Sequence, residues 1–153
     1  MTVRQGLLAA AVACLMSGLY SGSADATPSC PTTTLDRKVA NLTNKLVAKR
    51  RSTVQGAVDQ LLALGPSVVP SLVSRMNDRR LTRPHLVAYP SEGFESLAHY
   101  YPEKVVDVLD VVLTVLTPGG PACGLSDAST DAARTACEAA WFEWATREAG
   151  ASR

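Results

Sequence analysis

The sequence has few of the side chains on which catalysis and metal binding usually depend. Only 2 of its 153 residues are histidine and 4 are cysteine, while aromatic residues make up 5% of the chain. It contains no G-x-S-x-G, H-E-x-x-H, Walker loop or G-x-G-x-x-G motif. Because no C-x-x-C occurs, a zinc ribbon or thioredoxin-type motif has no support. We therefore expect no enzyme activity, no cofactor and no metal site.

The chain also has no large excess of positive or negative charge, since its formal net charge is +1. This argues against a protein whose main task is non-specific binding of nucleic acid. The small total conceals an asymmetry, because residues 27–90 carry a net charge of +7 and residues 91–153 a net charge of −6. Either the two halves pair with each other, within one chain or in a head-to-tail homodimer, or the charges steer a protein partner.

Long apolar runs are scarce, and a short one lies at the N-terminus. Arg4 precedes the apolar segment Gly6–Met16, and a small polar stretch then ends in an Ala-Asp-Ala site. These are the parts of a secretory signal peptide, and the apolar segment is shorter than the roughly 20 residues of a membrane span. We predict a signal peptide over residues 1–26, a single domain over residues 27–153, and export to the periplasm without a membrane span. A buried N-terminal helix and lipidation at Cys14 are the alternatives.

Export changes what the remaining cysteines mean, because disulfides form in an oxidising compartment. Cys30, Cys123 and Cys137 lie in the mature chain and allow one intramolecular bond. Closing the short loop between Cys123 and Cys137 would contribute about 3 kcal/mol to stability. We predict this bond in a structural role, because nothing indicates a reactive thiol of low pKa. A bond from Cys30 to either of the others is the alternative; otherwise Cys30 is free or bridges a dimer.

The remaining pattern predicts an all-α domain of about six helices. Apolar residues recur in steps of three and four between capping residues, glycines and prolines. Two capping-box patterns, Thr33-x-x-Asp36 and Ser52-x-x-Gln55, begin the first two helices, whereas residues 78–90 show no period and predict a long loop. The expected helices are Thr32–Arg51, Ser52 to the Gly65-Pro66 break, Ser67–Met76, Ser91–Tyr101, Glu103–Leu116 and Asp127–Gly150.

The segment Glu103–Leu116 is rich in valine, which would suit a strand. Asp107, Asp110 and Thr114 nevertheless fall on one narrow polar stripe of a helix, so we predict a central buried helix, with a strand as the alternative. We expect the Asp107/Asp110 pair to be a solvated helix face rather than acid–base machinery. In the last helix, the expected stripe consists of Ala133, Cys137, Ala140 and Trp144.

Two stretches of the chain are similar to each other. QLLALGPSVVPSLVSRM at 60–76 and ESLAHYYPEKVVDVLDVVL at 95–113 both have Leu-Ala, a turn ending in proline, and then a valine-rich helix. A two-helix unit repeated at this spacing is typical of α-solenoids, and the first stretch resembles HEAT or armadillo repeats. The resemblance implies a right-handed stack of helical hairpins.

In size, export signal, helical pattern and retained cysteines, the chain resembles the amidase immunity proteins of type VI secretion systems. The resemblance implies a periplasmic, non-enzymatic protein that binds a secreted peptidoglycan amidase. A protruding loop or helix end would plug the active-site cleft of that enzyme. A periplasmic scaffold or adaptor that uses the concave face of a helical stack is the alternative.

The segment Asp78–Tyr101 is the best candidate for a partner-binding surface. It combines a long loop with a short predicted helix and holds arginines and aromatic residues, which are common at the energetic centres of interfaces. We expect Phe94 to be core, and the basic face of Thr32–Arg51 is the next candidate surface. The predicted partner-binding residues are Arg79, Arg80, Arg83, His85, Tyr89, Ser91, Glu92 and Tyr100.

Overall fold

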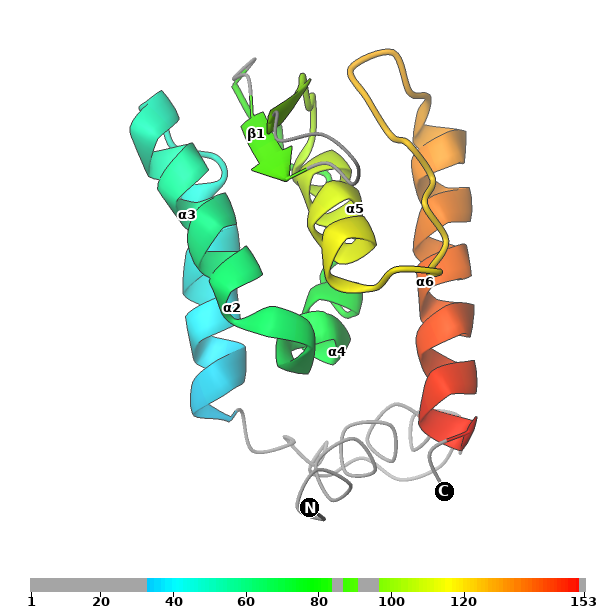
Figure 1. Ribbon diagram of the computed structural model, residues 1–153. Helices are drawn as coiled ribbons and strands as arrows, with labels where there is room; N and C mark the ends of the chain where they lie inside the picture. Colours follow the sequence, from blue (N-terminus) through cyan, green and yellow to red (C-terminus); the bar gives the residue numbers. More distant parts are fainter. Residues whose placement is uncertain (1–32, 84–86, 91–96, 152–153) are drawn as a thin grey trace, which may run out of the picture.

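The computed structural model describes residues 33–83, 87–90 and 97–151, which form an all-α domain with one added β-hairpin (Figure 1). The predicted helical class is therefore confirmed. The predicted signal peptide, Cys14 and Cys30 lie outside the described residues, and so do His85, Ser91, Glu92 and Phe94.

The first two helices, α2 (Thr34–Lys45) and α3 (Arg51–Ala63), pack against each other. The capping box that begins α2 is confirmed, since Thr33 Oγ1 accepts a hydrogen bond from Asp36 N and Thr33 N donates to the Asp36 carboxylate. The box expected at the start of α3 is wrong. That helix begins at Arg51, so Ser52 already lies in the first turn, and Gln55 bonds to a distant segment instead.

A tight break follows α3, as the Gly-Pro pair predicts. Gly65 adopts a φ of +69°, a left-handed conformation that glycine tolerates well. The expected helix Ser67–Met76 is shorter and divided into a 3-10 turn, η2 (Gly65–Val68), and the helix α4 (Val69–Val73). No single helix in the described part of the chain has the length and hydropathy to cross a membrane; α3 and Gly65–Val73 pass that test only as a pair bent by 106°.

The middle of the chain forms an antiparallel hairpin of β1 (Val87–Pro90) and β2 (Leu97–Tyr100). The expected helix Ser91–Tyr101 is therefore wrong at residues 97–100, and the expected loop 78–90 contains a strand. The cause is non-local, because the Gln55 carboxamide on α3 pairs with both backbone groups of Ala88 at 2.9 Å. Since β2 replaces the first helix of the second two-helix unit, the repeat is not seen in the described residues and a HEAT-like stack is not confirmed.

The helix α5 (Val105–Leu116) crosses the middle of the molecule, with α2 and α3 on one side and α6 (Asp131–Ala151) on the other (Figure 1). All residues of Val105–Leu113 are buried, which confirms the predicted central helix. Its first amides donate to backbone carbonyls of an earlier loop, Val105 N to Arg80 O and Val106 N to Asp78 O. These bonds satisfy orphan donors at the helix start.

The buried side of α6 differs from the expected stripe. Arg134, Cys137 and Trp141 are buried together with Ala149, whereas Ala133 is exposed, and Ala140 and Trp144 are half-buried. Arg134 and Trp141 both hydrogen-bond to aspartates of α5. The helix therefore presents the face that carries its polar bonds rather than the face with most alanine.

Candidate functional site

Two arginines of the predicted binding segment form hydrogen bonds and ion pairs with other residues of the chain. Arg79 donates to Met76 O at 2.5 Å and to Glu138 on α6 at 2.8 Å. Arg80 grips Asp78 through Nε and Nη2, with N–O distances of 2.9 and 2.6 Å, and also reaches Asn44. Burial raises the pKa of Asp78, but the hydrogen bonds from Arg80 outweigh it and the net shift is downward. The side chains of Arg79 and Arg80 therefore hold the loop in place through bonds within the chain. The role predicted for them in partner binding stays a prediction.

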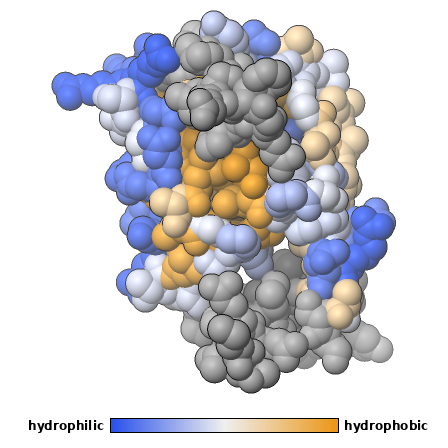
Figure 2. Space-filling view, in the orientation of Figure 1, coloured by the Kyte–Doolittle hydropathy of each residue, from blue (hydrophilic) through white to orange (hydrophobic). Residues whose placement is uncertain are grey.

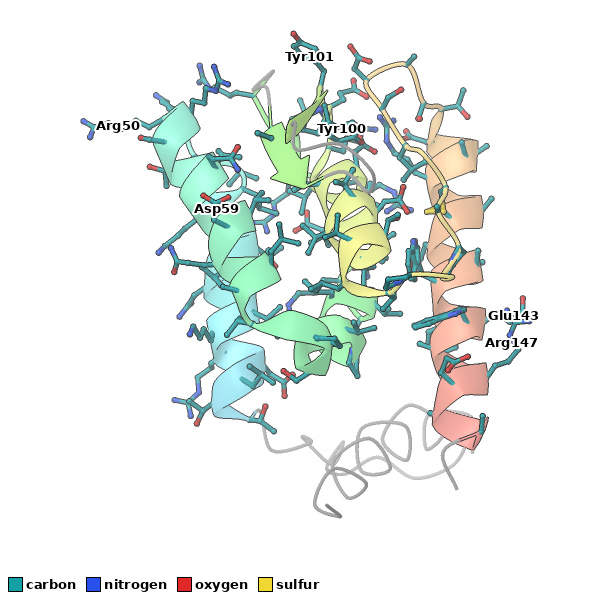
Figure 3. The ribbon with its side chains drawn as sticks, viewed as in Figure 1. Arg50, Asp59, Tyr100, Tyr101, Glu143 and Arg147 are labelled. Atoms are coloured by element: carbon teal, nitrogen blue, oxygen red, sulfur yellow. A yellow bond between two sulfur atoms is a disulfide. The ribbon has the colours of Figure 1, made fainter. Side chains whose placement is uncertain are left out.

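Among the described residues of this segment, the exposed side chains are Arg80, Leu81, Arg83 and Tyr101. Because Arg80 is paired with Asp78, we call the other three, Leu81, Arg83 and Tyr101, the rim. Leu81 is 65% exposed and Tyr101 is 56% exposed, two of the three large hydrophobic side chains that stand out in the described residues. The backbone segments that carry them are joined, because Thr82, which is buried between Leu81 and Arg83, donates from N to Glu103 O and from Oγ1 to Pro102 O, the residue after Tyr101. Figure 3 shows Tyr101 directed away from the helices.

Leu81 and Tyr101 were not among the residues that the sequence pattern selected for binding. The available signal was a single leucine set between arginines in R-R-L-T-R, together with the second of two adjacent tyrosines. Of the selected residues, Tyr100 is half-buried and its hydroxyl donates to Leu125 O. The Tyr89 backbone pairs with Ala98 in the hairpin. The roles predicted for the side chains of Tyr89, His85, Ser91 and Glu92 stay predictions.

A second exposed surface is the basic face of α2, the turn after it and the start of α3. Figure 2 shows hydrophilic side chains along this edge of the molecule, and Arg50 points outward in Figure 3. Among the described residues, Arg79–Glu138 is the one ion pair that joins the basic and acidic halves of the chain. Internal pairing therefore leaves this face uncompensated; its members are Arg37, Lys38, Lys45, Lys49, Arg50 and Arg51, all of them exposed.

The expectation that Asp107 and Asp110 form a solvated face is wrong, because they are 0% and 1% exposed. Asp107 receives Arg134 Nε and Nη2 at 2.7 and 3.0 Å, and Arg134 is itself 2% exposed. The same guanidinium also donates to Glu103 and to two loop carbonyls. Hydrogen bonding to Asp107 raises the pKa of Arg134, so the buried guanidinium stays protonated.

One turn later, Asp110 meets Trp141 and the predicted disulfide. Trp141 Nε1 donates to Asp110 Oδ1 at 2.8 Å, and Leu125 N donates to Oδ2 at 3.2 Å. Burial raises the pKa of Asp110, although the hydrogen bond from Trp141 opposes that rise. The Cys123–Cys137 bond is present with a Cα–Cα distance of 5.9 Å, so the alternative bonds from Cys30 to these cysteines do not form.

The loop that carries Cys123 lies against the Trp141 ring. A Cβ atom at Gly120 would lie 2.8 Å from two ring carbons, so only glycine fits there without a shift. The ligand atoms of Asp110, Cys123 and Cys137 lie within 4.8 Å of one another, a spacing that suits a metal ion. Both sulfurs are already joined to each other, so this group is a disulfide beside a carboxyl group.

Known proteins do not supply a function for this arrangement. No family model, curated protein or solved structure matches the chain. The surfaces and buried groups described above are therefore the basis for inferring what the protein does.

Proposed function

We propose that this protein is an exported, non-enzymatic protein that binds another protein through the rim of Leu81, Arg83 and Tyr101. The observation that carries the proposal is the exposure of two large apolar side chains, Leu81 and Tyr101, and the cation Arg83 on two backbone segments that Thr82 joins. Aromatic and arginine side chains are enriched at protein interfaces, where their contact area is large for the entropy lost.

The rim stands on a preorganised frame, which supports a binding role. Leu81 forms an isolated bridge with Lys104, and the bonds of Thr82 fix the chain between Leu81 and Arg83. Arg79 and Arg80 tie the start of the same loop to α6 and α2. A surface held in its bound shape loses less conformational entropy on association, so a larger share of the contact energy appears as affinity.

The partner we propose is a secreted peptidoglycan amidase, with the rim inserted into its active-site cleft. Support comes from the resemblance of the chain to amidase immunity proteins and from the exposed apolar side chains of the rim on a helical body. A periplasmic scaffold or adaptor is the alternative, and it would bind through a broad helical face rather than through the rim.

The test measures the affinity of the mature protein for the candidate amidase by calorimetry, together with inhibition of cell-wall hydrolysis. We expect Leu81→Ala and Tyr101→Ala to weaken binding about thirtyfold each, the equivalent of about 2 kcal/mol, without lowering the stability of the protein. Phe142→Ala, which removes a side chain that is 47% exposed on α6, is the matched control and should leave affinity unchanged. Unchanged affinity in the rim variants overturns the proposal, and loss of affinity on reversing charges at Lys49 and Arg50 would place the interface on the basic face.

A further inference from the structure

The two ends of the disulfide differ in their access to solvent. Cys123 lies exposed in the loop after α5, whereas Cys137 is 3% exposed on the inner face of α6. Exchange of a disulfide requires a thiolate to approach one sulfur in line with the bond that breaks. Cys123 is therefore the exposed end of the bond, and attack on its sulfur would make Cys137 the leaving group.

The buried sulfur touches a carboxyl group. Cys137 Sγ lies 3.3 Å from Asp110 Oδ1, the oxygen that also accepts the Trp141 indole N–H. Because burial raises the pKa of Asp110, this carboxyl group holds its proton to a higher pH than an exposed aspartate does. The other charged groups facing this site are Asp107 on α5 and Arg134 on α6, one turn away, and they pair with each other.

A thiolate released inside this site needs a proton. An unpaired charge in an apolar interior is costly, and burial disfavours the thiolate form of a cysteine. Asp110 is the group in contact with the sulfur where that charge would develop. The Trp141 and Leu125 N–H groups remain as donors to the carboxylate that is left after the proton has moved.

We propose that Cys123–Cys137 is a redox-active disulfide that exchanges with external thiols, with Asp110 donating a proton to the Cys137 sulfur. A thiolate attacks Cys123 Sγ, a new S–S bond forms there, and the Cys123–Cys137 bond breaks with its electron pair on Cys137 Sγ. The Asp110 proton moves to that sulfur. A second thiolate then attacks the external sulfur of the mixed disulfide and releases Cys123 as a thiolate. Two thiols are oxidised to one disulfide, and the protein disulfide is reduced to two thiols.

The loop that carries Cys123 has contacts to the rest of the protein besides the disulfide. When the bond opens, the loop is still held by the hydrogen bond from Leu125 N to Asp110 and by the close approach of Gly120 to Trp141. We therefore expect reduction to remove the disulfide while the apolar and polar contacts between α5 and α6 remain. The inference stands on the buried cluster and does not depend on the rim.

The site of attack is tested with reduced glutathione as the probe. The full-length protein is incubated with glutathione, quenched with an alkylating agent and mapped by peptide mass spectrometry, which separates Cys123 from the other cysteines. We expect glutathione on Cys123 and the alkylating agent on Cys137. Two variants that each lack one cysteine of the bond give the matched comparison, with adducts on Cys14 and Cys30 mapped separately. Cys137→Ser should react with oxidised glutathione at Cys123 at least about tenfold faster than Cys123→Ser reacts at Cys137. Adducts mainly on Cys137, or a bond that opens only in denaturant, overturn the proposal.

The role of Asp110 is tested by the pH dependence of reduction, expressed as a rate constant per glutathione thiolate. At low pH the wild type should be at least about tenfold faster than Asp110→Asn, because the variant has no acidic proton to give. At high pH the order should reverse, because the Asp110 carboxylate then repels the leaving thiolate. Glu143→Gln, which removes a carboxylate from the exposed side of α6, should follow the wild type. If Asp110→Asn does not fold, the wild-type profile decides alone: a fall with rising pH supports the donor, and a flat profile overturns it.

Discussion

The contact between α2 and α3 and the contact between the central helix α5 and α6 are stabilised in different ways. Between α2 and α3 the contact is apolar, made by side chains such as Val39, Leu42, Val58 and Leu61, each of them no more than 2% exposed. Between α5 and α6 the contact contains a buried ion pair, a buried indole–carboxylate hydrogen bond and a disulfide. The first pair relies on the area removed from water, whereas the second relies on directional bonds.

The difference follows from the composition of α6. The four buried residues of this helix are Arg134, Cys137, Trp141 and Ala149, so it offers little aliphatic surface to the centre of the molecule. A helix of this kind gains less from non-directional burial, which contributes roughly 25 cal/mol for each Å² of apolar surface. Its position then depends on groups that must match in geometry, and such contacts tolerate substitution poorly.

The largest expected effect comes from placing methionine at one fully buried position in each pair. Arg134→Met should lower the free energy of unfolding by about 3–5 kcal/mol, because it leaves Asp107 as an unpaired buried charge. Leu61→Met should cost less than about 1.5 kcal/mol, because one apolar side chain replaces another of similar volume. Urea denaturation of both variants measures the contrast.

A double variant distinguishes the effect of removing the whole Arg134–Asp107 ion pair from the effect of removing Arg134 alone. Asp107→Leu combined with Arg134→Met removes both charges, and it should recover most of the stability lost in Arg134→Met. Equal costs for Arg134→Met and Leu61→Met would show that the two helix pairs are not stabilised differently.

Opening the disulfide should have the next largest effect, and it should act mainly on the α5–α6 side. Reduction should lower the free energy of unfolding by about 3 kcal/mol, because the bond closes a loop with a sequence separation of 14. Hydrogen exchange should then show the greater loss of protection in residues 117–126 and α6, with α2 and α3 less affected. Uniform loss across the chain would contradict this division.

A smaller effect is expected where the hairpin joins the α2–α3 side. Gln55→Met keeps the length of the side chain but removes both hydrogen bonds to Ala88, at a cost of about 1 kcal/mol. Faster exchange of the Ala88 amide would report the loss directly. Gln60→Met removes an exposed bond to Gly56 in the same helix and should change stability by less than about 0.5 kcal/mol.

One aspartate on each side, Asp36 and Asp110, should respond to pH in opposite directions, which is the smallest expected effect. Hydrogen bonds from Ser71 and Thr33 lower the pKa of Asp36, so its contribution is present above the ordinary value of 3.8 and lost as pH falls through the lowered pKa. Burial raises the pKa of Asp110, so its contribution is present below 3.8 and lost as pH rises toward the raised pKa. Stability measured from pH 2 to 7 should therefore show a smaller acid-side fall in Asp36→Asn, with the remainder from Asp78 and Asp131, whose pKa values are also lowered, while the Asp110 contribution remains.

Sequence patterns predicted the features that depend on neighbouring residues. The Thr33 capping box, the break at Gly65 and the buried helix over Val105–Leu116 are all local signals, and the structure confirms them. The Cys123–Cys137 bond was also predictable, because only a short loop separates the two sulfurs. These features need no knowledge of how distant segments meet.

The remaining features depend on contacts between residues that are far apart in the chain. The hairpin is fixed by Gln55, which lies 33 residues before Ala88. The burial of Asp107 depends on Arg134, which lies 27 residues later and whose charge gave no sign of an inward orientation. For α6, the apolar period predicted that Ala133 and Ala140 face the core, whereas the next residues, Arg134 and Trp141, are the buried ones. The prediction failed because alanine outnumbers every other residue on that helix.

The two aspartates of α5 have a further consequence before the chain has folded. Between Val105 and Leu116 every residue except Asp107, Asp110 and Thr114 is valine or leucine, and valine strongly favours extended structure. A run of this kind without charge is prone to form intermolecular β-sheet, and a charge within it acts as a gatekeeper. Asp107 and Asp110 leave no more than three consecutive apolar residues before Thr114. The same carboxylates that must find buried partners in the native state thus keep the nascent segment from aggregating until Arg134 and Trp141 have been reached.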